Sequence, residues 1–152
     1  MKEIVIKGRR VSKGKARGEA LVSRSPISFM HGVNPETGVI VEKGHELEGE
    51  SLTGKVLVFP VGKGSTAGSY QVYELSICSK APKAIINLRA DPVIAVGAIM
   101  SHIPMVDRLE ENPLETIRTG DDVEVDADAG VVRVKSKRGT PDTGRDPGPD
   151  PG

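Results

Sequence analysis

The 152-residue sequence lacks tryptophan, and aromatic residues make up only 3% of it. A folded core must therefore rest on valine, isoleucine, leucine and alanine. Lysine and arginine (21) balance aspartate and glutamate (21), and the lack of a basic excess argues against a nucleic-acid partner. No apolar run approaches the roughly 20 residues that span a membrane, and the N-terminus lacks the apolar segment of a signal peptide. We expect a cytoplasmic protein without a membrane partner.

Cysteine is nearly absent. The single residue, Cys78, excludes an internal disulfide and is compatible with a reducing compartment. Cys78 follows Ile77 in a helical pattern, where we expect a buried small residue. His31 and His102 do not form metal-ligand spacing with each other or with Cys78, so we expect this chain to bind no metal by itself.

Core-forming residues are also missing from the C-terminal end. Residues 138–152 read RGTPDTGRDPGPDPG, a composition typical of disordered segments. We therefore predict one folded domain over residues 1–136 and a disordered, Gly- and Pro-rich tail over residues 137–152.

The first third of the chain is predicted to be rich in β-structure. Apolar patterning indicates strands at residues 2–7, 19–23, 27–30 and 39–41. Asn34-Pro-Glu-Thr-Gly38 predicts a turn, because proline presets φ and glycine accepts a positive φ.

The middle of the chain changes character. Continuous apolar runs at residues 55–59 and 83–88 predict strands buried on both faces. Helices are predicted after them, over residues 66–78 and 91–100. In the first, Ala67, Tyr70, Tyr73 and Ile77 recur at helical spacing and predict its apolar face, and Asp91 provides an N-cap for the second.

The remaining elements are a short strand at residues 103–106 and a hairpin of residues 122–126 and 131–135. Together, these patterns predict an α/β fold in which β-strands surround a small β-α-β centre.

The segment between the strand at 55–59 and the following helix is the strongest functional candidate. It reads Gly62-Lys-Gly-Ser-Thr-Ala-Gly-Ser69. Glycines allow the backbone to approach a ligand closely, and the positive end of the helix dipole stabilises an anion there. Ser65 lies at this junction.

Three interpretations of the loop compete. Gly62-Lys-Gly-Ser-Thr-Ala67 matches the dinucleotide pattern G-x-G-x-x-A, but over 50 mainly β residues precede it, unlike a Rossmann domain. The loop is equally compatible with a simple strand-to-helix turn capped by Ser65. In the third interpretation, Ser65 is catalytic, because a serine hydroxyl can act as a base where its alkoxide is stabilised.

Three ordered motifs resemble a known family. Ile27-Ser-Phe-Met-His-Gly-Val-Asn-Pro-Glu-Thr-Gly38 resembles PLSFWGG-x-DPETG, and His45 with Gly49-Glu-Ser51 resembles H-x-L-x-G-E-S. The loop at residues 62–69 resembles G-x-G-S-S-x-G-S. These are the motifs of the small subunits of the aconitase-X family, and the resemblance covers nearly all of residues 1–135. Met30 and His31 depart from the Trp-Gly of the family pattern.

The resemblance implies a swivelling β/β/α domain, as in the mobile domain of aconitases. It implies an archaeal mevalonate-pathway hydro-lyase that converts (R)-5-phosphomevalonate to trans-anhydromevalonate 5-phosphate. The partner is a large subunit that holds a 4Fe-4S cluster, in a heterodimer or higher assembly. Aconitases follow their swivel serine with an arginine that binds a carboxylate, and Thr66-Ala67 supplies none, which disfavours a citrate-like substrate.

The resemblance assigns Ser65 as the proton acceptor. We expect Gly64, Thr66, Lys63 and Ser69 to contact the substrate, a small phosphorylated hydroxy acid. Two alternatives stay open: a related aconitase-X dehydratase acting on another hydroxy acid such as cis-3-hydroxyproline, and a non-catalytic nucleotide-binding domain.

Overall fold

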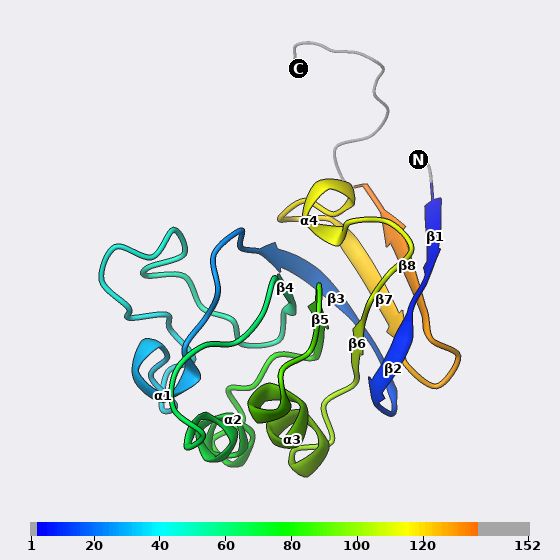
Figure 1. The fold of residues 1–152 in the computed structure, drawn as a ribbon. Helices are drawn as coiled ribbons and strands as arrows, with labels where there is room; N and C mark the ends of the chain where they lie inside the picture. Colours follow the sequence, from blue (N-terminus) through cyan, green and yellow to red (C-terminus); the bar gives the residue numbers. More distant parts are fainter. Residues whose placement is uncertain (1–2, 137–152) are drawn as a thin grey trace, which may run out of the picture.

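A computed structural model describes residues 3–136, and the tail predicted at residues 137–152 lies outside them (Figure 1). Strands and helices follow one another along the described chain. The strands are β1 (Glu3–Lys7), β2 (Arg9–Ser12), β3 (Lys15–Val22), β4 (Val56–Phe59), β5 (Ala84–Asn87), β6 (Met105–Asp107), β7 (Asp122–Asp126) and β8 (Val131–Lys135). The helices are α1 (Phe29–Gly32), α2 (Gly68–Ile77), α3 (Pro92–Met100) and α4 (Pro113–Thr116).

The strands form a mixed sheet in the order β1-β8-β7-β3-β4-β5-β6-β2. The central strands β3, β4, β5 and β6 are parallel, whereas the flanking pairs are antiparallel. The strand β3 serves both halves, because residues 15–19 pair with β7 and residues 20–22 pair with β4. Only Gly8 separates β1 from β2, the two outermost strands of the sheet. Because these strands follow each other directly in the chain, the two ends of the sheet meet at Gly8, and the sheet curls into a barrel-like shape.

Two apolar cores lie on the two faces of the parallel strands. The inner core fills the space between the sheet halves and contains Val58, Ile86 and Val125. The outer core lies beneath α2 and α3, which stand side by side on one face of the sheet (Figure 1), and contains Leu57, Leu75 and Ile94. Residues of β4 and β5 are buried on both faces, which explains their continuous apolar sequence.

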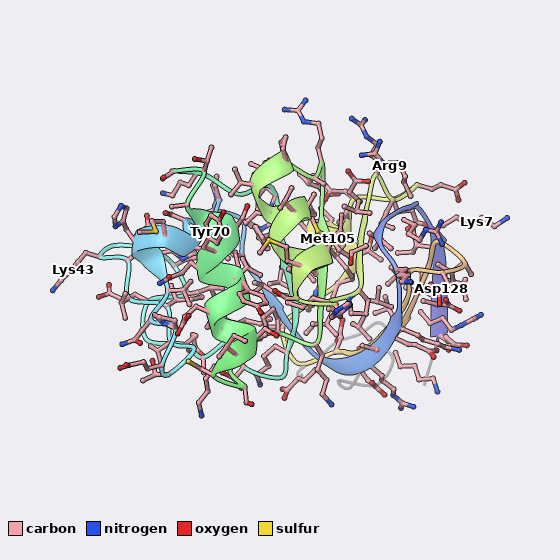
Figure 2. All side chains as sticks on the ribbon, turned by 90° about the horizontal axis from the view of Figure 1, so that it is seen from below. Lys7, Arg9, Lys43, Tyr70, Met105 and Asp128 are labelled. Atoms are coloured by element: carbon pink, nitrogen blue, oxygen red, sulfur yellow. The ribbon has the colours of Figure 1, made fainter. Side chains whose placement is uncertain are left out.

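The helices α2 and α3 approach each other closely at Gly97. A Cβ at this position would lie 2.8 Å from the Cβ of Val72. The predicted apolar face of the first helix is therefore wrong: Val72 and Leu75 are buried, whereas Tyr70 and Ile77 are exposed. Figure 2 shows Tyr70 on the outer side of the helix.

The predicted α/β class with a β-rich surround is confirmed, but several local predictions differ from the structure. Residues 27–30 and 39–41 form isolated bridges, and the first of these segments leads into α1, instead of forming strands. Cys78 is half-buried at the C-cap of α2 and is not a core residue. The prediction missed β2 and α4.

None of the helices within residues 3–136 combines the length and the apolar character needed to cross a lipid bilayer.

The junction at Gly8 has no room for a side chain. Its amide donates to the carbonyl of Gly130 at 2.8 Å. A Cβ on Gly8 would lie 2.3 Å from Cδ2 of Leu109 and 2.9 Å from the carbonyl oxygen of Asp107. The chain therefore changes from one half of the sheet to the other at a point where backbones pack against each other.

We expect Gly8→Ala to lower the free energy of unfolding by about 1–3 kcal/mol, because the methyl group overpacks the junction. Urea unfolding of the purified chain measures this. The control is Gly32→Ala in α1, where the new methyl meets mainly the flexible side chain of Glu42. Equal stability of the two variants would contradict the account of the junction.

Candidate functional site

The glycine-rich loop leaves the carboxyl end of β4 and leads into α2. Its first residues are held by neighbours on both sides. The carbonyl of Pro60 accepts hydrogen bonds from the amides of Leu88 and Arg89, at 3.0 and 3.4 Å, and the amide of Lys63 donates to the carbonyl of Ile27 at 3.1 Å. Ligands of open α/β sheets bind beyond the carboxyl ends of the strands, so the loop occupies the expected place for a site.

Ser65 is exposed at the tip of this loop. Its Oγ accepts a hydrogen bond from the amide of Ala67 at 3.1 Å. Within residues 3–136, the amides of Gly64, Ser65 and Thr66 donate to no protein acceptor. Three consecutive free N–H groups next to a hydroxyl make a setting in which negative charge is stabilised.

The helix begins later than the sequence predicts. Its N-cap is Ala67, not Ser65, and α2 starts at Gly68. The amide of Gly68 donates to the carbonyl of Ser65 at 2.9 Å, and the amide of Ser69 donates to the carbonyl of Thr66 at 3.3 Å. These tight turns precede the helix and leave Ser65 outside it, although its Oγ still accepts one amide.

Gly64 gives the loop its shape. Its φ is +99°, and a Cβ would lie 2.9 Å from Oγ of Ser28. Side chains rarely adopt this φ, so the position requires glycine for both conformation and space.

The other predicted contact residues fall into different environments. Thr66 is exposed beside Ser65. Lys63 is exposed too, but its Nζ forms an ion pair with Oε2 of Glu42 at 2.7 Å. Ser69 differs from both, because it is buried and its Oγ donates to the carbonyl of Val93 at 2.6 Å.

Asp91 joins the loop to the next helix. Its Oδ2 accepts from the amides of Val93 and Ile94 and caps α3, as predicted. Its Oδ1 accepts from the amide of Gly62 at 3.0 Å, a second role that sequence reasoning missed. One carboxylate therefore fixes both α3 and the start of the serine loop.

His45 provides a second support, for the segment that contains Ile27. Nδ1 of His45 accepts from the amide of Leu47 at 3.0 Å, and Nε2 lies 3.0 Å from the carbonyl of Pro26. Because Nδ1 is an acceptor, the hydrogen of this neutral imidazole is assigned to Nε2, which donates to Pro26. His45 is buried, and its two ring nitrogens connect the backbone at Leu47 to the backbone at Pro26.

Glu46 fixes the same segment from its other end. Burial raises the pKa of this carboxyl, but the backbone amide of Arg24 and the hydroxyls of Ser25 and Ser23 outweigh burial and hold the pKa below its ordinary value. The amide of Arg24 lies 2.7 Å from Oε1. The segment that carries Ile27 is therefore held in place by a charged acceptor.

The residues of this chain do not fit an iron–sulfur cluster. Such clusters are held by several cysteine thiolates, and the sequence contains one cysteine. Cys78 follows the last residue of α2, whereas Ser65 precedes the first turn. Within residues 3–136, no three His, Cys, Asp or Glu side chains gather as metal ligands.

The barrel-like sheet, the helical layer and the serine loop define a class of domain. The sequence matches the family model of the aconitase X swivel domain over residues 5–134. The chain belongs to the aconitase X swivel-domain family.

Relatives named as enzyme subunits match most of the chain. The chain is 57% identical to the phosphomevalonate dehydratase small subunit of Methanocella arvoryzae, over 85% of this chain and 98% of that protein. It is 51% identical to the subunit of that name from Thermococcus kodakarensis, over 85% of this chain and 95% of the relative.

Solved structures show the same fold. The crystal structure of Thermococcus kodakaraensis aconitase X in its holo form superposes with a TM-score of 0.83 at 49% identity, covering 88% of this chain and 99% of that chain. The solution NMR structure of a UPF0107 protein gives a TM-score of 0.81 at 46% identity, covering 88% of this chain and 100% of that chain.

Replacing Asp91 separates its two roles. We expect Asp91→Ala to lower the free energy of unfolding by about 1–2 kcal/mol, because it removes the cap. Asp91→Asn keeps one acceptor oxygen for the cap amides but loses the acceptor for Gly62. It should cost less stability, and hydrogen exchange of the Gly62 amide should still accelerate. An unchanged exchange rate in both variants would contradict the proposed tether.

The lowered pKa of Glu46 predicts that the free energy of unfolding depends on pH. A carboxyl with a lowered pKa in the folded state stabilises that state above its unfolded pKa of about 4.3, and this contribution is lost as pH falls through the folded pKa. The difference between the unfolding free energies of the wild type and Glu46→Gln should be constant well above the unfolded pKa and should shrink as pH falls through the lowered folded pKa of Glu46. A difference that persists at low pH would argue against a carboxylate acceptor.

Proposed function

We propose that this chain is the small subunit of a phosphomevalonate dehydratase, with Ser65 as the proton acceptor. The reaction removes water from (R)-5-phosphomevalonate to give trans-anhydromevalonate 5-phosphate in the mevalonate pathway of archaea. The observation that carries the proposal is the exposed hydroxyl of Ser65, which stands beside three free amides at the carboxyl end of β4. The names of the archaeal relatives support it.

The elimination breaks a C–H bond next to the substrate carboxylate and a C–O bond at the neighbouring carbon. A serine hydroxyl is a weak acid, so Ser65 can take the proton only if its oxygen is first held as an alkoxide. The amide of Ala67, which donates to Oγ at 3.1 Å, favours the charged form by hydrogen bonding, and the dipoles of the free amides of Gly64, Ser65 and Thr66 add to this effect. The proton moves to Oγ, and the electron pair of the C–H bond forms the double bond as hydroxide leaves.

Lys63 contributes less charge than the sequence suggests. Because Glu42 neutralises it at 2.7 Å, the pair positions the loop more than it attracts an anion. In our proposal, Gly64 and Thr66 line the substrate side of the loop. Ser69 acts indirectly by fixing α2 to α3 through the carbonyl of Val93.

Activation of the leaving hydroxyl requires a group that this chain does not supply. We propose that a large subunit provides it from a 4Fe-4S cluster, whose open iron acts as a Lewis acid when bound. The serine loop must then face that subunit, and residues 1–136 form the swivel domain that closes over the substrate. Because the substrate is a phosphorylated metabolite, the proposal places the enzyme in the cytoplasm.

The test uses the enzyme assembled from both subunits. We expect Ser65→Ala to reduce kcat by about 1,000-fold or more, since loss of a general base alone typically costs 100- to 10,000-fold. Subunit association and KM should stay near wild-type values. The matched control is Ser76→Ala at the far end of α2, which should retain full activity.

Retained activity of Ser65→Ala would overturn the assignment of the base. The same assembly should be assayed with cis-3-hydroxyproline. Turnover of that compound without turnover of 5-phosphomevalonate would replace the proposed substrate while leaving the role of Ser65 open to the same mutational test.

A further inference from the structure

Three arginines follow the sheet edge beside the serine loop. Arg89 lies two residues after β5, Arg108 follows β6 directly, and Arg9 begins β2, which pairs with β6. All three are exposed. The backbone connects them: the amide of Arg89 approaches the carbonyl of Pro60, and the amide of Arg108 donates to the carbonyl of Leu88 at 3.2 Å. They therefore extend one continuous edge that starts at the serine loop.

A buried carboxylate organises this arginine cluster. Asp107 is fully buried, and its two oxygens accept from Nε and Nη2 of Arg9 at 2.9 and 2.8 Å. Oδ2 also accepts from the amide of Ala90 at 2.7 Å. The side chain of Arg9 is 56% exposed, so its remaining N–H groups face outward. Figure 2 shows Arg9 projecting from the ribbon at the margin of the molecule.

The cluster carries excess positive charge. Within residues 3–136, Arg89 has no ion-pair partner, and Arg108 reaches only Asp107, at 4.0 Å. Asp107 thus pairs with Arg9 and lies near Arg108, whereas the guanidinium group of Arg89 has no carboxylate partner among the described residues. The nearby Asp91 is committed to backbone amides. Guanidinium groups bind phosphate through paired hydrogen bonds, so the ligand chemistry that suits this edge is a phosphate monoester.

The spacing agrees with the proposed substrate. Five bonds separate the phosphorus of 5-phosphomevalonate from the carbon that loses its proton, which corresponds to about 6 Å in an extended chain. Neighbouring strands lie about 4.8 Å apart. Arg89 and Arg108 stand at the ends of the first and second strands beyond β4, or roughly 5 and 10 Å from it along the edge. Both arginines therefore lie beyond β4 at separations on the scale of the extended substrate.

We propose that Arg89 and Arg108 bind the phosphate of the substrate while Ser65 reaches its acidic carbon, and that Asp107 holds Arg9 as the outer wall of this site. This inference rests on the proposed function and names the residues that select a phosphorylated substrate. Sequence reasoning missed them, because Arg89 and Arg108 stand 19 positions apart in loops with no shared motif.

The test compares KM and kcat in the assembled two-subunit enzyme. We expect Arg108→Gln and Arg89→Gln each to raise KM for 5-phosphomevalonate about tenfold, the loss typical of one charged hydrogen bond. Their kcat should stay within about threefold of wild type, unlike that of Ser65→Ala. Arg108→Lys should recover part of the KM. Inorganic phosphate should inhibit the wild type competitively and the Gln variants more weakly.

The control is Arg133→Gln, an exposed arginine of β8 whose Nε lies 3.6 Å from Glu124, and it should behave like the wild type. Wild-type KM in both Gln variants would overturn the arginine site while leaving the dehydratase assignment intact. Weakened subunit association with unchanged KM would make the edge an interface and overturn the site too. If the wild-type assembly does not turn over 5-phosphomevalonate, the proposed function fails, and this substrate site fails with it.

Discussion

The closure of the sheet at Gly8 is the constraint on which the other elements depend. Because β1 and β2 are one segment interrupted by a single residue, the first ten described positions bind both halves of the sheet, through β8 and β6. Between these halves, the parallel strands β4, β5 and β6 pair directly with one another, so their carboxyl ends lie along one edge of the sheet. The serine loop, the cap of α3 and the arginine edge all follow those ends.

The sequence predicts the central elements well, because their patterns are local. The buried runs of β4 and β5, the Asp91 cap and the hairpin of β7 and β8 all appear where the patterning indicates them. The missed β2 is short and charged, with the sequence RRVS, and is a strand only because β6 lies beside it. Residues 27–30 and 39–41 form bridges instead of strands for the same reason, because pairing between separate segments determines their structure.

Part of the candidate site could be predicted from the sequence, and part could not. Ser65 and Gly64 stand in a loop whose composition already indicates close backbone approach, and the structure adds the free amides around them. Glu42 could not be foreseen as the partner of Lys63, because the two lie 21 positions apart in loops without regular spacing. The helical periodicity of Tyr70, Tyr73 and Ile77 was misleading, since the close contact at Gly97 turns the opposite face of α2 inward.

The short outer strands also affect how readily the chain associates with other molecules. An unpaired strand edge can recruit a strand from another molecule, and long flat edges promote aggregation. Here the outer edges belong to β1 and β2, of five and four residues, which follow each other through Gly8 and carry lysine and arginine. A newly made chain of this kind offers neighbouring molecules little template for strand addition.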